Sequence, residues 1–414
     1  MSAARRTLAQ LGGTTTWGDC RAALAHLAGA RPLLDGPAIG RYETAFAREV
    51  GVAHAVSFAA GRVGLYGLLR ALGVGAGDEV ILQVPTHIVV ANAIRYTGAR
   101  PVYADCDPRS CNLDVTAVER AVTPRTRALV AQHTFGIPVD LDPVLAIAEH
   151  HGIDVIEDCV HALGATYRGR KIGSLGRAAF FSTEETKTIS TTMGGMVVTD
   201  DAALAQRMRA FQRRCARPRA ALVRRRLLKL IAYHVLTQPQ LHRYARVVYD
   251  ATGRHHPLPR PTTADEIAGE RPERYEERLS NAQAAIGLRQ LRRLDANVAH
   301  RRAVAAAYAQ LLARHGVPAP AVPAGAQASP VRHPVWCRDR AAAMRVLAPH
   351  AVPGTWFTSV LEEAASPSHG GYEAGHCPRA EAVAAHLVNL PTHPRVRPDD
   401  VRRIVAALAP HVRG

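Results

Sequence analysis

Between residues 50 and 200, short apolar segments alternate with amphipathic segments along the chain. The apolar segments are rich in Val, Ile, Ala and Phe, and such short runs are typical of strands. The predicted strands are Ala55–Phe58, Glu79–Val84, Arg100–Ala104, Ala128–His133, Asp154–Glu157, Ala178–Ser182 and Gly195–Thr199. Some of them, such as the run VILQV, are apolar on both faces, as strands buried in a parallel sheet are.

The amphipathic segments between these strands have apolar positions spaced three or four residues apart, which predicts helices. The predicted helices are Arg62–Leu72, His87–Thr97, Val115–Val122, Pro143–His151 and Ala202–Arg214. Because strands and helices take turns along the chain, the predicted fold is α/β, with a mostly parallel central sheet flanked by helices.

Residues 217–260 interrupt this alternation. The segment Leu222–Leu236 predicts an amphipathic helix whose polar face is rich in Arg. Such a helix either meets an anionic substrate or a membrane surface, or packs on the protein with its Arg side chains in water. The sequence leaves both interpretations open. A Pro-rich connector, His256–Pro261, follows this helix.

The rest of the chain predicts a smaller C-terminal α+β domain. Residues 281–314 are rich in Ala, Leu and Arg and are expected to form one long helical region, followed by a Pro-rich linker at 317–325. The last helix is expected at Pro398–Leu408, opened by Asp399 and Asp400. The predicted organisation is an N-terminal arm at 1–35, a large α/β domain at 36–255 that contains most of the basic segment 217–260, and a small domain at 256–414.

The composition excludes several classes of protein. With 47% hydrophobic residues the chain can bury one large core or two smaller ones, which excludes a disordered protein. No apolar run reaches the roughly 18 residues of a membrane-spanning helix, and the N-terminus lacks the features of a secretory signal. The seven cysteines are scattered without a Cys-x-x-Cys pair, and the histidines show no metal-ligand spacing. We therefore expect a cytoplasmic protein with no metal site.

Basic residues outnumber acidic ones, with 52 Lys and Arg against 35 Asp and Glu, a formal net charge of +17. Such an excess fits nucleic-acid binding or an anionic small substrate. The sequence shows no helix-turn-helix, zinc-finger or RNA-recognition motif, so a phosphate-bearing small molecule is the expected partner. Lysine is rare, with Lys171, Lys187 and Lys229 only, which leaves three candidates for any chemistry that needs an amine.

Three kinds of chemical group are predicted at strand–loop junctions. Asp158 follows directly on a strand at its carboxyl end, Ser182 ends another strand, and Lys187 lies in the polar loop that follows. Upstream, the glycine-containing segment Ala59–Gly64 joins a strand to a helix, where backbone N–H groups and the helix dipole can receive a phosphate. A lysine amine, a carboxylate and a phosphate cradle are what pyridoxal phosphate requires.

The motifs around these residues resemble the DegT/DnrJ/EryC1/StrS family of aminotransferases. The resemblance extends from about residue 36 to the C-terminus, with residues 217–270 poorly matched. It is carried by Gly77-Asp-Glu-Val-Ile, His133-Thr-Phe-Gly-Ile-Pro, Ile156-Glu-Asp-Cys-Val-His-Ala-Leu-Gly-Ala, Phe181-Ser-Thr-Glu-Glu-Thr-Lys, Gly194-Gly-Met-Val-Val-Thr, Arg278-Leu-Ser-Asn-Ala-Gln-Ala-Ala-Ile-Gly and Asn389-Leu-Pro-Thr-His.

This resemblance implies a fold-type-I enzyme that depends on pyridoxal 5'-phosphate and works as a homodimer with active sites at the interface. It assigns Lys187 as the Schiff-base lysine and Asp158 as the partner of the pyridine nitrogen. Further cofactor contacts are implied for Ser182 and the loop residues Gly61 and Arg62 on the phosphate, for His161 near the 3-oxygen and for His87 on the ring.

The chain departs from the family pattern at three of these places. Arg62 stands where the phosphate loop usually has Thr, and an arginine can hold a phosphate through two hydrogen bonds. His87 replaces the usual stacking aromatic residue. Where the partner subunit usually offers Asn, this chain has Glu276, two residues before Arg278, so that the usual substrate-side arrangement is altered there.

The function that the resemblance implies is transfer of an amino group from L-glutamate or L-glutamine to a keto-sugar, expected to be nucleotide-linked. Because Lys187 is present where dehydratase relatives carry His, the amine needed in both halves of a transamination is available. Other hypotheses are a same-family enzyme acting on a keto-cyclitol or another non-sugar ketone, a lyase-type reaction, and a non-catalytic binder of anions or nucleic acid.

Overall fold

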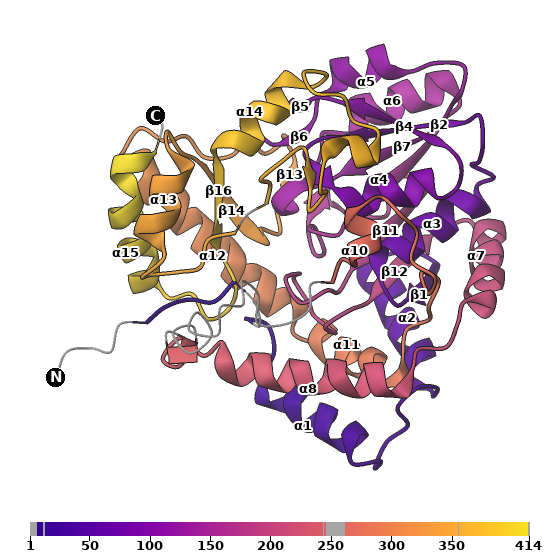
Figure 1. Cartoon of the computed structure of the whole chain (residues 1–414), viewed down its shortest axis with the longest axis horizontal. Coiled ribbons are helices and arrows are strands. Elements are labelled where there is room, and N and C mark those ends of the chain that lie inside the picture. Colours follow the sequence, from indigo (N-terminus) through magenta and orange to yellow (C-terminus); the bar gives the residue numbers. More distant parts are fainter. Residues whose placement is uncertain (1–5, 11–12, 243, 246–260, 355, 413–414) are drawn as a thin grey trace.

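A seven-stranded sheet forms the centre of the larger part of the molecule (Figure 1). In this computed structural model the described residues are 6–10, 13–242, 244–245, 261–354 and 356–412. The strands, in spatial order, are β1 (His54–Phe58), β12 (Gly195–Thr199), β11 (Ala178–Ser182), β8 (Asp154–Asp158), β7 (Thr126–Gln132), β2 (Glu79–Gln83) and β4 (Arg100–Ala104).

Neighbouring strands of this sheet are mostly parallel. β12 runs antiparallel to β1 and β11, and the remaining neighbours pair in parallel. The predicted α/β fold with a mostly parallel central sheet is therefore confirmed. Because the carboxyl ends of parallel strands meet at one edge, the residues that follow β1, β8 and β11 are brought together there, where ligands bind in such sheets.

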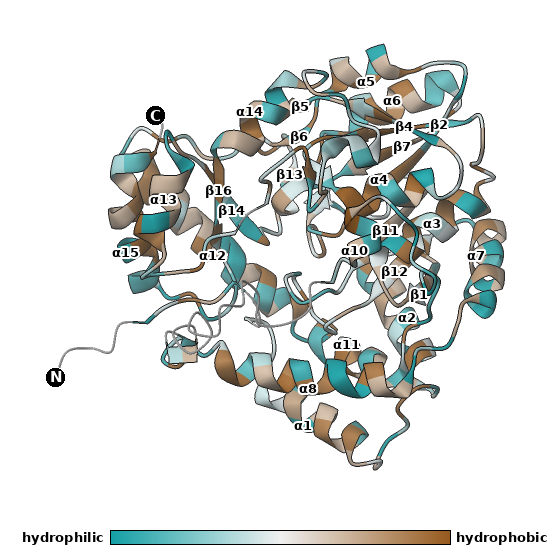
Figure 2. Cartoon of the chain, viewed as in Figure 1, coloured by the Kyte–Doolittle hydropathy of each residue, from teal (hydrophilic) through white to brown (hydrophobic). Residues whose placement is uncertain are grey.

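Helices cover both faces of the sheet, whose strands are apolar along their length (Figure 2). One apolar cluster joins the sheet to the helices α3, α4 and α7, and a second joins its other face to α2, α5, α6 and α11. These helices are α2 (Ala38–Val50), α3 (Gly61–Ala71), α4 (Ile88–Arg95), α5 (Val115–Ala121), α6 (Leu141–His151), α7 (Ala202–Arg214) and α11 (Asn281–Leu291).

The elements predicted between residues 50 and 214 all form, and each begins and ends within two residues of its predicted bounds. Outside this stretch α2 was not predicted, and neither were the short elements of the loops. The short strands and 3-10 turns are β3 (Thr86–His87), β5 (Cys106–Asp107), β6 (Asn112–Leu113), β9 (Thr166–Tyr167), β10 (Arg170–Lys171), β13 (Ala326–Gln327), β15 (Leu361–Glu362), η1 (Thr134–Gly136), η2 (Pro367–Gly370) and η3 (Ala409–His411).

The C-terminal part of the chain has its own apolar core. An antiparallel pair of strands packs there with three helices, seen on the left of Figure 1. The elements are β14 (Arg332–Trp336), β16 (Leu387–Pro391), α12 (Leu294–Ala313), α13 (Arg340–Leu347) and α15 (Pro398–Leu408). The predicted boundary at 255/256 falls outside the described residues, as does most of the connector 256–261. The short helix α10 (Ala264–Ile267) packs against α4, and α11 packs against α2.

The prediction of one long helical region at 281–314 is wrong, because the chain forms two helices, α11 and α12, separated at residues 292–293. The break has a tertiary cause. Gln290, in the last turn of α11, exchanges two hydrogen bonds with the backbone of Ser190, at 2.8 Å each. Arg293, at the start of α12, donates to Asp19 at 2.7 Å. These contacts hold the two helix ends in place.

The basic helix of the sequence forms as α8 (Ala220–Leu236), which lies along α1 (Trp17–Leu27) at the bottom of Figure 1. The apolar side of α8, which includes the fully buried Val223 and Leu227, packs against residues of α1 and α11. The packing of this helix on the protein is therefore confirmed, and the role of its Arg face stays open. Some Arg side chains of α8 border a cleft that is described below.

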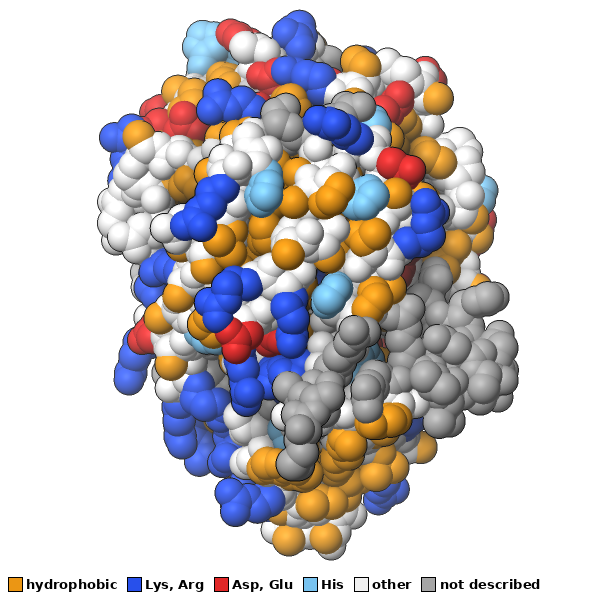
Figure 3. Space-filling view, turned by 90° about the vertical axis from the view of Figure 1, so that its left-hand side faces the viewer, with side chains coloured by type: hydrophobic (Ala, Val, Ile, Leu, Met, Phe, Trp, Pro, Cys, Tyr) orange, Lys and Arg blue, Asp and Glu red, His pale blue; other side chains and the backbone are white. Residues whose placement is uncertain are grey.

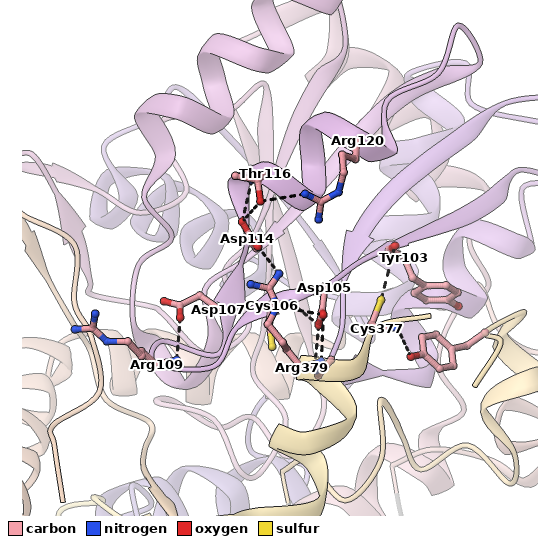
Figure 4. A network of polar contacts seen from close by, with 12 residues as sticks. Tyr103, Asp105, Cys106, Asp107, Arg109, Asp114, Thr116, Arg120, Cys377 and Arg379 are labelled. Atoms are coloured by element: carbon pink, nitrogen blue, oxygen red, sulfur yellow. Dashed lines mark hydrogen bonds and ion pairs between the residues drawn. The ribbon is translucent and has the colours of Figure 1, made fainter. Parts of the chain in front are cut away.

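The helix α14 (Pro378–His386) attaches the C-terminal part to the large sheet (Figure 4). Asp105, just after β4, accepts hydrogen bonds from the backbone N–H groups of Arg379 at 3.1 Å and Ala380 at 2.8 Å, and from the Arg379 Nε at 3.2 Å. Arg379 also pairs with Asp114. One carboxylate thus caps α14 and ties it to the neighbouring part of the chain.

Basic side chains predominate over acidic ones on the face shown in Figure 3, in keeping with the net charge of +17. All seven cysteines are free and buried. Among the described residues, no helix has both the length and the apolar character needed to span a membrane.

Candidate functional site

Asp158 ends β8 at the ligand edge of the sheet and is completely buried. Its Oδ1 accepts a hydrogen bond from the backbone N–H of Val160 at 3.1 Å, whereas its Oδ2 has no hydrogen-bond partner. Burial raises the pKa of this carboxyl to about 7, because the charged form loses its hydration. A buried carboxylate oxygen without a partner is suited to accept a hydrogen bond from a ligand N–H.

Lys187 lies in the loop between β11 and β12, where its backbone N–H donates to the carbonyl of Glu184 at 3.1 Å. Its Nζ lies 4.1 Å from the centroid of the Trp356 ring. Burial lowers the pKa of this amine to about 8, although the negative charges of Glu184 and Asp158 oppose the shift. A larger fraction of the amine is therefore neutral, and thus nucleophilic, near neutral pH.

The two other lysines are held in ion pairs. Lys171 Nζ lies 2.8 Å from Glu49, and Lys229 Nζ lies 2.9 Å from Glu185. Lys187 forms no ion pair with any carboxylate of the described residues. Of the three candidates for amine chemistry, Lys187 is the one that the fold places beside a buried carboxylate at the sheet edge.

The N-terminus of α3 forms a cradle of backbone groups next to the end of β11. α3 begins at Gly61 without a side-chain cap, so the N–H groups of its first turn are open to a ligand. A Cβ at Gly61 would meet the Phe181 carbonyl oxygen at 3.1 Å and the Ser182 Cβ at 3.4 Å, and a Cβ at Gly195 would meet the Gly61 nitrogen at 2.4 Å. The two glycines allow the helix terminus and the hydroxyl of Ser182 to lie together, as a phosphate site requires.

The side chain of Arg62 points away from a direct phosphate contact. Its Nε pairs with Glu266 at 3.0 Å, and its Nη2 donates to the carbonyl of Pro261 at 2.5 Å. Because Glu266 is buried, this pair holds α10 against the start of α3. We expected the Arg62 side chain to hold a phosphate through two hydrogen bonds, and the structure corrects this, because the side chain is bound to Glu266 and Pro261. Arg62 contributes only its backbone N–H, in the first turn of α3, to the cradle.

Two histidines lie on loops at the same edge. His161 is buried and stacks on the Trp356 ring, with ring centroids 4.3 Å apart, and its Nδ1 accepts from the N–H of Phe135 at 3.3 Å. Burial holds its pKa well below the usual value, so the ring is neutral and its Nε2 carries the proton. His87 caps α4 through Nδ1, and its Nε2 lies 3.3 Å from Glu363.

Glu276 and Arg278 lie on a segment that runs beside the end of β1, where the Ala59 N–H donates to the Glu277 carbonyl at 3.0 Å. Glu276 pairs with Arg271, and the backbone N–H of Arg278 donates to Ala216 at 3.0 Å. Their expected role concerns the active site of a partner subunit, and it stays a prediction.

Two residues near Lys187 were missed by the sequence analysis, Trp356 and Arg332. Trp356 contacts both Lys187 and His161 through its ring, and the Arg332 Cζ lies 5.3 Å from the centroid of the same ring. The one signal in the sequence was Arg332 itself, a charged residue that begins an otherwise largely apolar strand close to the Asn389 motif. The fold, not sequence spacing, brings both residues to the site.

His133, Glu157 and Cys159 offer ligand atoms within 4.8 Å of one another, although no metal site was expected. The Glu157 carboxylate accepts from the N–H groups of Gly173, Leu175 and Gly176 at 2.7–2.8 Å and contacts His133 Nε2 at 3.2 Å. These contacts already use both oxygens of the Glu157 carboxylate. We therefore interpret the Glu157 side chain as a structural link between β8 and the turn that follows it.

Comparison with known proteins identifies the family. The model of the DegT/DnrJ/EryC1/StrS aminotransferase family matches residues 18–229 and 235–409. GDP-perosamine synthase of Caulobacter vibrioides is 34% identical over 388 residues, which is 90% of each chain. A UDP-N-acetyl-3-dehydro-alpha-D-glucosamine 3-aminotransferase of Acidithiobacillus ferrooxidans is 30% identical, over 86% of this chain and 84% of that protein.

Solved structures agree with this assignment. The aminotransferase DesV of S. venezuelae superposes with a TM-score of 0.75 at 28% identity, covering 95% of this chain and 94% of that one. DesI, determined with its TDP-sugar product, gives a TM-score of 0.73 at 28% identity, covering 98% and 92%. Because the family model matches most of the chain and relatives are at least 30% identical over most of their length, the chain belongs to the DegT/DnrJ/EryC1/StrS aminotransferase family.

Proposed function

We propose that this chain uses pyridoxal 5'-phosphate to move an amino group from L-glutamate or L-glutamine to a ketone of a nucleotide-linked sugar. The observation that carries the proposal is the buried Asp158, whose Oδ2 lacks a partner, at the same sheet edge as the one unpaired lysine. A carboxylate in that state fits a cofactor whose ring nitrogen must stay protonated.

The residues at this edge fit the three ends of that cofactor. Lys187 would hold its aldehyde carbon, Asp158 its ring nitrogen, and the N–H groups of Gly61 and Arg62, together with the Ser182 hydroxyl, its phosphate. The neutral His161 would donate from Nε2 to the ring oxygen. When bound, the cofactor supplies an electron-accepting ring that stabilises negative charge on a neighbouring carbon.

The side chains of the protein then have separate tasks. The Lys187 amine acts as the base that takes a proton from the donor Cα and as the acid that returns one, and a pKa of about 8 suits both directions near neutral pH. Asp158 keeps the ring nitrogen charged. The packed ring of Trp356 excludes water from one side of the amine.

A basic cleft beside the cradle supports a nucleotide-linked acceptor. This cleft has a volume of about 800 Å³ and continues from the start of α3 along the Arg-rich side of α8. Its cationic lining consists of Arg219, Arg225 and Arg226, together with Arg62, Lys229 and Arg274, which pair with Glu266, Glu185 and Glu277. Arginine forks match phosphate oxygens well. The relatives named above act on GDP- and UDP-linked sugars, and DesI was determined with a TDP-sugar.

The predicted homodimer belongs to the same proposal. Trp17 on α1 and Leu228 on α8 are 60% and 56% exposed, which leaves large apolar side chains in water near the basic cleft. A second copy of the chain that covers this face would bury them and would bring its Glu276 and Arg278 close to the site.

The experiment treats purified holoenzyme with L-glutamate, L-glutamine and other amino acids and follows its visible absorbance. A donor should remove the absorbance of the aldehyde form of the cofactor, and a 15N-labelled donor should then label a GDP-, UDP- or TDP-linked keto-sugar, read by mass spectrometry. A spectrum that does not change with any amino acid would contradict amino transfer. Label that passes only to a free keto-cyclitol would contradict the nucleotide-linked acceptor.

A further inference from the structure

Arg332 is a fully buried cation without a partner. It is the first residue of β14 and is 2% exposed, yet Nε, Nη1 and Nη2 all lack a hydrogen bond. Within the described part of the chain, no carboxylate forms an ion pair with it. A guanidinium in this state has lost its water without gaining a hydrogen bond, which is unfavourable unless a ligand supplies the missing acceptor.

No carboxylate of the described residues forms a hydrogen bond or an ion pair with Arg332, and the charge of Glu184 acts on it only from a distance. Arg332 and Lys187 line one small cavity together with Arg301, Glu185 and His393. Glu185 is the one carboxylate among the described residues that line this cavity, and it forms an ion pair with Lys229 at 2.9 Å. Burial lowers the pKa of His393 to about 3, so this ring is neutral.

Arg301 differs from Arg332 in that two of its nitrogens are hydrogen-bonded. Its Nε donates to Asn297 Oδ1 at 2.9 Å, and its Nη1 donates to Val331 and Thr392, each at 3.1 Å. The local structure therefore accounts for one buried arginine and leaves the other with its donors unused.

Arg332 also lies next to the amine that reacts. The Cζ of Arg332 and the Nζ of Lys187 lie 5.3 Å and 4.1 Å from the centroid of the same Trp356 ring. Asn389 donates its side-chain N–H to the backbone carbonyl of Trp356. Whatever anion Arg332 binds is therefore a close neighbour of the group that reacts with Lys187.

We propose that Arg332 binds the α-carboxylate of the amino-acid donor. This inference rests on the proposed function. In an α-amino acid the carboxylate is attached to the carbon that carries the transferred amino group, so it must lie close to Lys187. The planar guanidinium offers two parallel N–H donors that match the two carboxylate oxygens. The phosphates of a nucleotide-linked acceptor are separated from its ketone by the sugar ring, so they do not lie beside Lys187. The basic cleft along α8 would bind them instead.

The first test is the donor half of the reaction in the variants Arg332→Gln and Arg332→Lys, measured against the concentration of L-glutamate. Loss of a hydrogen-bonded charge pair should raise the donor KM about 10- to 100-fold in Arg332→Gln, and less in Arg332→Lys. The KM for the keto acceptor should stay within about twofold, because the acceptor offers no carboxylate.

The matched control is Arg302→Gln. Arg302 is the neighbouring half-buried arginine, and it donates only to backbone carbonyls, at 2.7 Å to Ala328 and 3.2 Å to Gly164. Its loss should leave the donor KM unchanged. A donor KM in Arg332→Gln equal to that of wild type, or an increase confined to the acceptor KM, would overturn the inference.

A second measurement does not depend on turnover. Because Arg332→Met removes an unpaired buried charge, the cofactor-free variant should have a Tm equal to or above that of wild type. 2-Oxoglutarate should raise the Tm of wild type and should no longer do so in Arg332→Met. A lowered Tm in Arg332→Met would indicate a structural role and would overturn the inference. Failure of wild type to react with any amino acid would instead contradict the proposed function itself.

Discussion

Burial moves the pKa values of Asp158 and Lys187 toward each other, to about 7 and about 8. In water these groups would be ionised carboxylate and ammonium across the physiological range, and neither would readily exchange a proton. Pairs of groups with displaced pKa values are typical of acid–base sites. The protonation of both groups therefore responds to a ligand near neutral pH.

The raised pKa of Asp158 predicts a pH dependence for the stability of the cofactor-free protein. Between about pH 4 and pH 7 the folded state holds a proton that the unfolded state has released, so the free energy of unfolding falls as the pH rises. The part of the slope that Asp158 contributes should approach about 1.4 kcal/mol per pH unit in that range. Urea unfolding at several pH values measures it. In Asp158→Asn this contribution should vanish, and a slope equal to that of wild type would contradict the assignment.

Asp158→Asn should also reduce amino transfer while leaving the chain folded. The amide cannot supply the negative charge that keeps the ring nitrogen protonated, so kcat should fall about 10- to 100-fold. Steady-state assay of the holoenzyme measures this. Asp154→Asn, at the half-exposed opposite end of β8, is the matched control and should retain the activity of wild type.

The roles of single residues were only partly predictable from the sequence. Asp158 and Lys187 could be found because each follows a strand within a motif. The true orientation of the Arg62 guanidinium depends on Glu266, which is more than two hundred residues away in the chain. Arg332 and Trp356 meet Lys187 only through the packing of the C-terminal part, which no local pattern records.

The contact between β12 and the start of α3 shapes the phosphate cradle, and Gly195 makes that contact possible. A Cβ there would meet the Ala60 carbonyl carbon at 2.3 Å and the Gly61 nitrogen at 2.4 Å. Gly195→Ala should therefore displace the N-terminus of α3, weaken cofactor binding and reduce stability by about 1–3 kcal/mol.

Titration of cofactor-free Gly195→Ala with pyridoxal phosphate, together with urea unfolding, tests this prediction. The matched control is Gly40→Ala, because a Cβ at that exposed position of α2 meets nothing within 4 Å. It should be neutral or stabilising by up to about 1 kcal/mol. Equal cofactor affinity in the two variants would contradict the role given to Gly195.

The elements of the sheet could be predicted from the sequence because their apolar runs reflect burial on both faces. The break between α11 and α12 could not, because it has no Gly or Pro and depends on the bonds from Gln290 to Ser190. The antiparallel direction of β12 could not be predicted either, since β12 is buried along its whole length just as the parallel strand β2 is.

The C-terminal part must stay docked for Arg332 and Trp356 to reach Lys187, and Asp105 is a principal link (Figure 4). Asp105→Ala removes the cap of α14 and the bond to Arg379, so we expect a loss of about 1–3 kcal/mol in stability and a lower kcat. As a control, Asp339→Ala removes only the local cap of α13. Urea unfolding and activity assays should show that only Asp105→Ala lowers kcat.

The most direct test of the central claim is to locate the covalent link between the cofactor and the protein. Holoenzyme is reduced with borohydride, digested and mapped by mass spectrometry, which distinguishes the chain's three lysines, Lys171, Lys187 and Lys229. The structure predicts that Lys187 alone carries the reduced pyridoxyl group and that Lys187→Ala carries none. Label on Lys171 or Lys229, or none on the wild-type chain, would contradict the assignment of Lys187 as the amine that carries the chemistry.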